Sequence, residues 1–200
     1  MPTRVGGTAN LDGYIMRGDV DVFVEAKCTE IYSSHKTIEV SDVYEDVYRQ
    51  LVGKTHKKFS YDNNGRPIKD GKTDDKHFKC TFKFDGEKIV HFDIKQLICH
   101  FLAISANILE NEKANKNVKF VYLIFNPEEV IEQVEKESYK KQIIEIFGDT
   151  KKEITDYFDM ELLFESIFEI QAKRLGLEGK KYSSFVFCIA DQKDYKEKIK

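Results

Sequence analysis

The feature that most constrains the fold is a nearly all-apolar segment at residues 118–125. A strand of this kind is typical of a parallel sheet, in which other elements cover both faces. An amphipathic helix is predicted just before it, over residues 93–111, because apolar side chains recur there at helical spacing and only Ser105 interrupts the stripe. A last buried strand is predicted at residues 183–190. The sequence therefore predicts an α/β protein, with a central mixed sheet and helices packed on its faces.

Turn and capping signals predict the remaining elements. Two strands, residues 8–16 and 20–28, flank a turn signal at Arg17-Gly18-Asp19. A helix is predicted over residues 41–52. Asn126-Pro127 has the form of a helix start, and this helix is predicted to end at Gly148. Another helix is predicted from residue 150 to residue 175, before Gly176.

The length of 200 residues predicts a single domain over residues 1–200. Residues 53–92 are predicted to be a polar, basic insertion in it. Its first part, residues 53–77, is rich in turn-forming residues and is predicted to be an exposed loop. Its second part is predicted to be a β-hairpin, with strands at 78–84 and 88–92 around Asp85-Gly86.

The net charge of −3 hides an uneven distribution of charge. Residues 1–48 hold 4 basic and 9 acidic side chains, whereas residues 49–95 hold 12 basic and 7 acidic ones. A solvated charged loop is one interpretation of the basic segment. The other is a surface that binds a phosphate backbone, and its candidate residues are Lys54, Lys57, Lys58 and Arg66.

Neither a membrane-spanning segment nor a secretory signal is predicted. No apolar run reaches the roughly 18 residues that a spanning helix needs. The chain also does not open with a charged segment followed by an apolar one. We therefore expect a cytoplasmic protein with no membrane partner.

The two N-terminal strands carry the sharpest chemical signal. In an antiparallel hairpin, the numbers of directly paired residues have a constant sum. A four-residue loop at 17–20 makes that sum 37, and Asp12 then lies opposite Glu25. Directly opposed residues share a face, with Cβ atoms about 4.5–5.5 Å apart. Lys27 lies on the same face as Glu25, while a slip of one residue would move Asp12 to the other face. Alternation also predicts that the opposite face is the buried one, and its residues are Val20, Val22, Val24 and Ala26.

Two carboxylates at this spacing can hold one hard divalent cation, Mg²⁺ or Mn²⁺, together with the backbone carbonyl of Ala26. Such a cation polarises a phosphodiester and lowers the pKa of a bound water. Lys27 would orient that water or stabilise the developing charge. The alternative interpretation is a surface hairpin with a Glu–Lys pair and a lone Asp12.

These residues resemble the PD-(D/E)XK, or restriction-endonuclease-like, nuclease superfamily. The resemblance rests on Asn10-Leu11-Asp12-Gly13-Tyr14-Ile15, followed by Val22-Phe23-Val24-Glu25-Ala26-Lys27-Cys28-Thr29-Glu30. It implies that Asp12 and Glu25 are metal ligands and that Lys27 is the catalytic lysine. The segment is also similar to bacterial restriction endonucleases with E-x-K-x-T-E, which adds Glu30. The function implied is a magnesium-dependent endonuclease that hydrolyses double-stranded DNA, with a homodimer as the expected assembly.

The helix over residues 93–111 extends the resemblance. Gln96-Leu97-Ile98-Cys99-His100 is similar to the Q-x-x-x-Y helix motif, with His100 in place of Tyr. Asp93 and Gln96 also fit a capping box, in which Gln96 would bond only to the backbone at the helix start. The resembled core usually opens with a helix and a strand before the Asp strand. Because only eleven residues precede Asp12, we expect either that the chain is a fragment or that this helix is missing or supplied later in the chain.

Two further functional hypotheses stay open at this point. One is a non-catalytic nucleic-acid-binding or assembly module that retains the nuclease fold. The other is an unrelated α/β interaction protein, which would be favoured if Asp12 and Glu25 lay on opposite faces of the sheet.

Overall fold

The structure is a computed structural model. It describes residues 1, 3, 8–28, 30–32, 38–51, 59–67, 77–84, 87–111 and 116–200. Within these residues, no helix has both the length and the apolar character needed to cross a bilayer.

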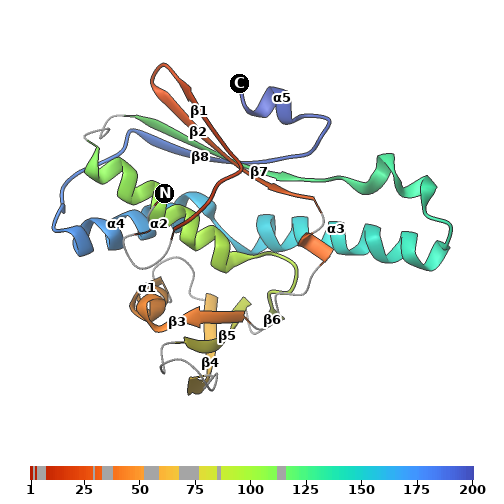
Figure 1. The fold of residues 1–200 in the computed structure, drawn as a ribbon, viewed down its shortest axis with the longest axis horizontal. Coiled ribbons are helices and arrows are strands. Elements are labelled where there is room, and N and C mark those ends of the chain that lie inside the picture. The colour runs from red at the N-terminus through yellow and green to blue at the C-terminus, as the bar shows by residue number, and fades with distance from the viewer. Residues whose placement is uncertain are drawn as a thin grey trace.

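The main sheet has four strands in the order β1-β2-β7-β8. β1 (Gly13–Arg17) and β2 (Val20–Lys27) form an antiparallel hairpin, and β7 (Asn117–Ile124) and β8 (Ser184–Ala190) continue the sheet in parallel with β2. The sheet crosses the upper part of Figure 1, with the helical layer below it. The prediction of an α/β protein with a mixed sheet is therefore confirmed.

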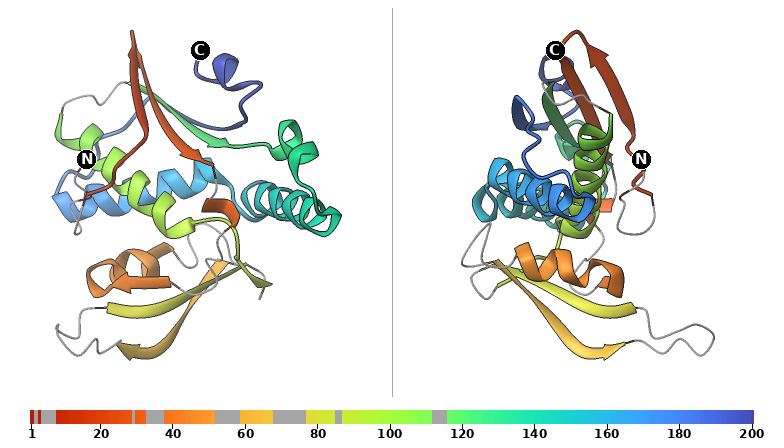
Figure 2. Two further views of the ribbon diagram at one scale, coloured as in Figure 1. Left: turned by 45° about the vertical axis from the view of Figure 1, so that its right-hand side comes forward. Right: turned by 90° about the vertical axis from the view of Figure 1, so that its left-hand side faces the viewer.

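The helical layer consists mainly of α2 (Ile94–Glu110), α3 (Glu137–Tyr157) and α4 (Met160–Leu175). Aromatic rings join the layers: the ring of Phe101 packs edge-on against Phe120 of β7 and Phe185 of β8. The opposite face of the sheet carries only the short C-terminal helix α5 (Tyr195–Lys198) in the described part of the chain, as Figures 1 and 2 show. The two faces of β2 are thus covered by different elements, the helical layer on one side and the C-terminal residues on the other.

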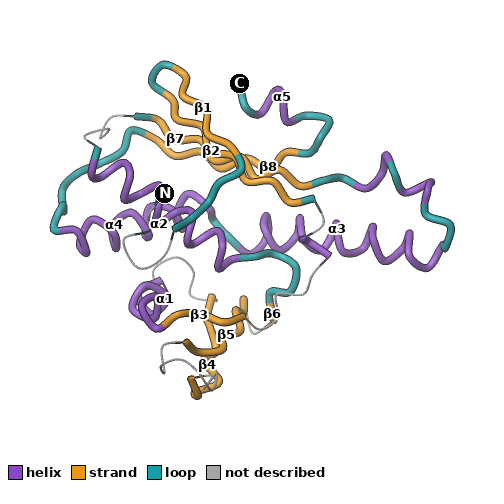
Figure 3. Tube along the Cα trace, in the orientation of Figure 1, coloured by secondary structure: helices purple, strands orange, loops and turns teal. Residues whose placement is uncertain are grey.

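A second sheet lies on the far side of the helices (Figure 3). It contains β3 (Ile38–Ser41), β5 (His77–Phe84) and β4 (Phe59–Pro67) in that order, and β6 (Glu87–Lys88) pairs with β5. The helix α1 (Glu45–Leu51) follows two 3-10 turns, η1 (Glu30–Tyr32) and η2 (Asp42–Tyr44). Phe82 and Tyr48 belong to the same buried core as Phe101, so one core connects both sheets.

The structure confirms one prediction for the insertion and corrects another. β5 and β6 form the expected hairpin, with Lys83 paired to Lys88, although the second strand is only Glu87–Lys88 and does not reach residue 92. However, the predicted loop over residues 53–77 is wrong at residues 59–67, which form β4, and at His77, which begins β5. β3, at residues 38–41, is also an element that the sequence patterns did not indicate.

The predicted helices after β7 are also corrected. Asn126 does cap a helix, since its Oδ1 accepts the N–H of Glu128, but that helix is the 3-10 turn η3 (Pro127–Glu129), followed by η4 (Ile131–Gln133). α3 then continues through Gly148. The predicted helix over residues 150–175 is interrupted before α4, where Asp159 accepts the N–H of Leu162 as a new N-cap. The predicted end of α4 at Gly176 is confirmed, with φ at 66°.

Candidate active site

The predicted register of the first hairpin is confirmed. Gly13 pairs with Val24 and Arg17 pairs with Val20, although the turn is the two residues 18–19 rather than a loop of four. Asp12 comes one residue before β1 and is exposed. Its Oδ2 accepts the backbone N–H of Ala26 at 2.7 Å. The Asp12 carboxylate is thereby held against the strand segment that separates Glu25 from Lys27.

The prediction for the buried face of β2 is only partly right, because Val22 is 1% exposed as expected but the opposite face is buried as well. Glu25 is 2% exposed and Lys27 is 6% exposed, whereas Val24 and Ala26 on the opposite face are only partly buried. The reason is the position of the helical layer, which packs on the Glu25 face. The valine face is covered by residues at the C-terminus, including Tyr195 of α5. The polar face of β2 is thus enclosed between the sheet and α2.

Four polar side chains from two elements meet in this enclosed layer. Lys27 Nζ donates to Glu25 Oε1 at 2.6 Å and also donates to Gln96 Oε1 of α2. His100, one helical turn after Gln96, places Nε2 3.0 Å from Glu25 Oε2. The structure therefore brings together Glu25, Lys27, Gln96 and His100, and we call them the buried polar cluster.

The environment of Glu25 keeps its carboxyl group ionised. Burial alone would raise the pKa of this carboxyl group, but the contacts with His100 and Lys27 outweigh burial, and the pKa is lowered. The contact between His100 Nε2 and Glu25 Oε2 is close but poorly directed, so both atoms lack a well-formed hydrogen bond within the described residues. Glu25 Oε2 is thus a buried acceptor with capacity for a further ligand.

Gln96 forms one half of the predicted capping box through its backbone, while its side chain contacts Lys27. Its backbone N–H donates to Asp93 Oδ1 at 3.0 Å, so Asp93 does cap α2 as a capping box requires. Its side chain, however, accepts from Lys27. The capping interaction fixes the first turn of α2, and that turn positions the amide against the catalytic candidate.

The other predicted residues lie apart from the cluster or outside the described residues. Glu30 begins η1, and its Oε2 accepts the N–H of Cys28 at 3.0 Å. Arg66 lies in β4, but its side chain is outside the description. The predicted DNA-contacting residues Lys54, Lys57 and Lys58 also lie outside the described residues.

One supporting residue was not found by sequence reasoning. Glu153 of α3 is buried and accepts the backbone N–H groups of Val90, His91 and Phe92 at 2.7–2.9 Å. These three residues lead directly into the N-cap of α2, so Glu153 fixes the start of the helix that carries Gln96. The contact joins residues about 60 positions apart, and no local pattern in the sequence indicates it.

The donor atoms fit a hard divalent cation. Asp12, one residue before β1, offers oxygen ligands, as do Glu25 and the carbonyl of Ala26 in β2, and Mg²⁺ prefers oxygen ligands. The unsatisfied Oε2 of Glu25 is an observation in favour of the fit. In the described part of the chain, no three or more His, Cys, Asp or Glu side chains are already grouped as a metal site.

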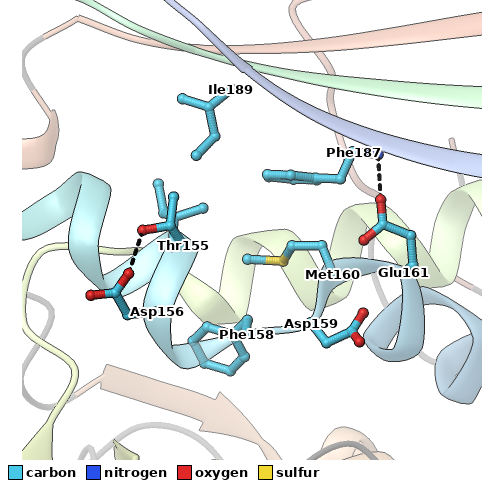
Figure 4. A pocket seen from close by; sticks show the side chains of 9 residues that line it. Thr155, Asp156, Phe158, Asp159, Met160, Glu161, Phe187 and Ile189 are labelled. Atoms are coloured by element: carbon cyan, nitrogen blue, oxygen red, sulfur yellow. Dashed lines mark hydrogen bonds between the residues drawn. The ribbon is translucent and has the colours of Figure 1, made fainter.

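A cavity of about 420 Å³ opens next to the cluster. It is lined by residues of the N-terminal segment and of the first turns of α2, among them Asn10, Asp93, Gln96 and His100. Another cavity, of about 600 Å³, lies between the α3–α4 junction and β8 (Figure 4). There, Glu161 accepts the N–H of Phe187 at 3.2 Å, and no residue of the buried polar cluster lines the cavity. Gln96 and His100 of the buried polar cluster therefore border the first cavity and not the second.

Comparison with family models, with curated protein sequences and with solved structures finds no match to this chain. The geometry of Asp12 and the buried polar cluster is consequently the basis for any functional proposal.

Proposed function

We propose that this protein is a magnesium-dependent endonuclease that hydrolyses phosphodiester bonds in DNA, with the restriction-endonuclease-like arrangement that its motifs resemble. The observation that carries the proposal is the Lys27 ammonium, which lies between Glu25 and Gln96 beside the Asp12 strand. A buried lysine held by a carboxylate and an amide is poised for charge stabilisation. A surface hairpin would instead leave the side chains of Glu25 and Lys27 in solvent.

Each residue then has a defined role. Asp12, Glu25 and the carbonyl of Ala26 would hold Mg²⁺ or Mn²⁺, which when bound polarises the phosphodiester and lowers the pKa of a bound water. Lys27 donates hydrogen bonds toward the charge that develops on the phosphoryl oxygens. Gln96 keeps the flexible lysine side chain in place, and preorganisation of this kind reduces the reorganisation needed during reaction.

The test is cleavage of plasmid DNA in the presence and absence of Mg²⁺ or Mn²⁺. We expect metal-dependent cleavage by the wild type, and a loss of at least about 100-fold in Glu25→Gln and Lys27→Met. Lys119→Met is the matched control: Lys119 pairs with Val22 and so lies on the opposite face of the sheet from Glu25. An inactive wild type, or equal activity in all three variants, contradicts the proposal.

One observation favours the alternative, a nucleic-acid-binding module without catalysis. Lys27 Nζ lies 2.6 Å from Glu25 Oε1 in a buried ion pair, so the ammonium already compensates the charge of Glu25 without a cation. Calorimetric titration with Mn²⁺ separates the two functions. A nuclease should bind the ion and lose binding in Asp12→Asn, whereas the module binds DNA with no heat from Mn²⁺.

A further inference from the structure

The first half of α3 presents an apolar surface that the rest of the described chain covers only in part. Within residues 137–149, which are all described, no side chain is buried, and burial in α3 begins at Thr150. Tyr139 is 52% exposed and Val130 is 38% exposed, and both are among the large apolar side chains that reach solvent. Large exposed apolar groups that gather in one place mark interaction sites more often than chance.

These residues form a groove rather than a flat patch. The groove has a volume of about 570 Å³ and lies between α3 and the 3-10 turns η3 and η4. The wall on α3 is built from residues at helical spacing, Tyr139, Gln142, Ile143 and Ile146, and the wall on the turns includes Val130, Ile131 and Val134. Such a stripe is the buried face of an amphipathic helix, and here it has only a partial cover.

The rim of the groove is acidic. Glu128, Glu132 and Glu135 each follow directly after a residue that lines the groove, and all three are exposed. Lys140 and Lys193 approach some of these carboxylates, and Lys136 Nζ lies 5.1 Å from the centre of the Tyr139 ring, yet residues 126–137 contain five acidic side chains and one basic one. This charge repels the phosphates of a nucleic acid and attracts a cationic partner.

We propose that this groove binds a cationic amphipathic helix of a partner protein, with the apolar face of that helix against Tyr139, Ile143 and Val130 and its lysines or arginines against the acidic rim. A helix laid into a hydrophobic groove uses apolar anchors at this spacing. Cys28, which immediately follows Lys27, also lines the groove. The proposal does not depend on nuclease activity.

The test uses the full chain and a fluorescein-labelled synthetic helix of leucine and lysine, measured by fluorescence anisotropy. A peptide with glutamate in place of lysine and a scrambled peptide of the same composition are the probes for charge and for the apolar face. We expect the cationic helix to bind at least about tenfold more tightly than either one. Hydrogen exchange of residues 138–147 should also slow when it binds.

Variants locate the binding site. Ile143→Asp should weaken binding at least about tenfold. The matched control is Ile144→Asp, because Ile144 is on the same helix, is 52% exposed and does not line the groove. Tyr139→Ala gives a second, milder variant should Ile143→Asp fail to fold. Equal weakening by Ile143→Asp and Ile144→Asp, equal affinity for the lysine and glutamate peptides, or displacement of the peptide by single-stranded DNA overturns the proposal.

Discussion

Lys27 is the residue on which the candidate site depends most strongly. Its ammonium is almost completely removed from water and has two oxygen partners, Glu25 and Gln96. A buried ion pair contributes little compared with apolar residues of the same volume, but loss of one partner leaves an uncompensated buried charge. The buried pair is therefore better explained by a chemical role than by a contribution to stability.

We expect Lys27→Met to lower the free energy of unfolding by about 3 kcal/mol or more, because it leaves the Glu25 carboxylate buried without its ammonium partner. The double variant Glu25→Leu with Lys27→Met should recover most of this loss. Urea denaturation followed by circular dichroism measures both. Lys141→Met is the control, since the Lys141–Glu145 pair is 3.8 Å long and exposed, and we expect a change below about 1 kcal/mol. Equal losses in the two lysine variants would contradict the burial argument.

Tyr182 should give a measurable alkaline transition. Burial against Phe164 and Phe168, together with the nearby carboxylates of Glu165 and Glu169, raises the pKa of Tyr182 to about 12 from an ordinary value of 10.0. A raised phenol pKa stabilises the folded state fully below the unfolded value, and this contribution is lost as the pH rises from about 10 to about 12.

The measurement for Tyr182 is an ultraviolet titration of the folded protein. The wild type minus Tyr182→Phe difference should show one phenol that ionises near pH 12, and the variant should lose less stability between pH 10 and pH 12. A difference spectrum centred near pH 10 would show that Tyr182 is in an ordinary environment.

Residue types and spacing predicted much of the candidate site. The hairpin register followed from the positions of Asp12 and Glu25 around a turn, and helical spacing brought His100 to the same layer as Gln96. The direction of burial could not be predicted this way. Which face of β2 is enclosed depends on where α2 packs, and this is a long-range property that local alternation does not contain.

At the scale of elements, glycine is a clear example of an ambiguous signal. Gly148 and Gly176 both look like helix ends in the sequence. Gly176 ends α4 with a positive φ of 66°, whereas Gly148 lies inside α3 without a positive φ. The tertiary contacts of the second half of α3, such as those of Glu153, hold that helix together across Gly148.

The two glycines should therefore respond in opposite ways to the same substitution. Gly148→Ala should stabilise the protein by about 0.5–1 kcal/mol, because alanine restricts the unfolded chain and a Cβ at this position meets no atom within 4 Å among the described residues. Gly176→Ala should destabilise it by about 1 kcal/mol or more, because alanine is strained in the left-handed conformation. Thermal denaturation of both variants measures this, and a destabilised Gly148→Ala would place a helix end at residue 148.

At the scale of the whole molecule, one buried core joins two sheets that the sequence patterns had not connected. Phe82 of β5 and Phe120 of β7 belong to the same core. β4 escaped prediction because its segment is dominated by polar and turn-forming residues and its pairing with β5 is irregular between Asn63 and Pro67. Such a strand is specified by its partner rather than by its own pattern.

The net charge of −3 also has to be interpreted for the molecule as a whole, because it is the sum of acidic and basic segments. If the basic segment contacts a DNA backbone, its lysines release counterions from the DNA on binding. Replacement of Lys54, Lys57 and Lys58 by glutamine should then reduce the slope of log affinity against log salt concentration by about 2 to 3. The measurement is anisotropy of labelled duplex DNA over a series of salt concentrations, without divalent metal so that no cleavage occurs.

The control replaces Lys141, Lys151 and Lys152, which are exposed on α3 and carry the same total charge. Equal slopes in the two triple variants would show that the basic segment acts only through the overall charge of the protein and does not contact the DNA backbone.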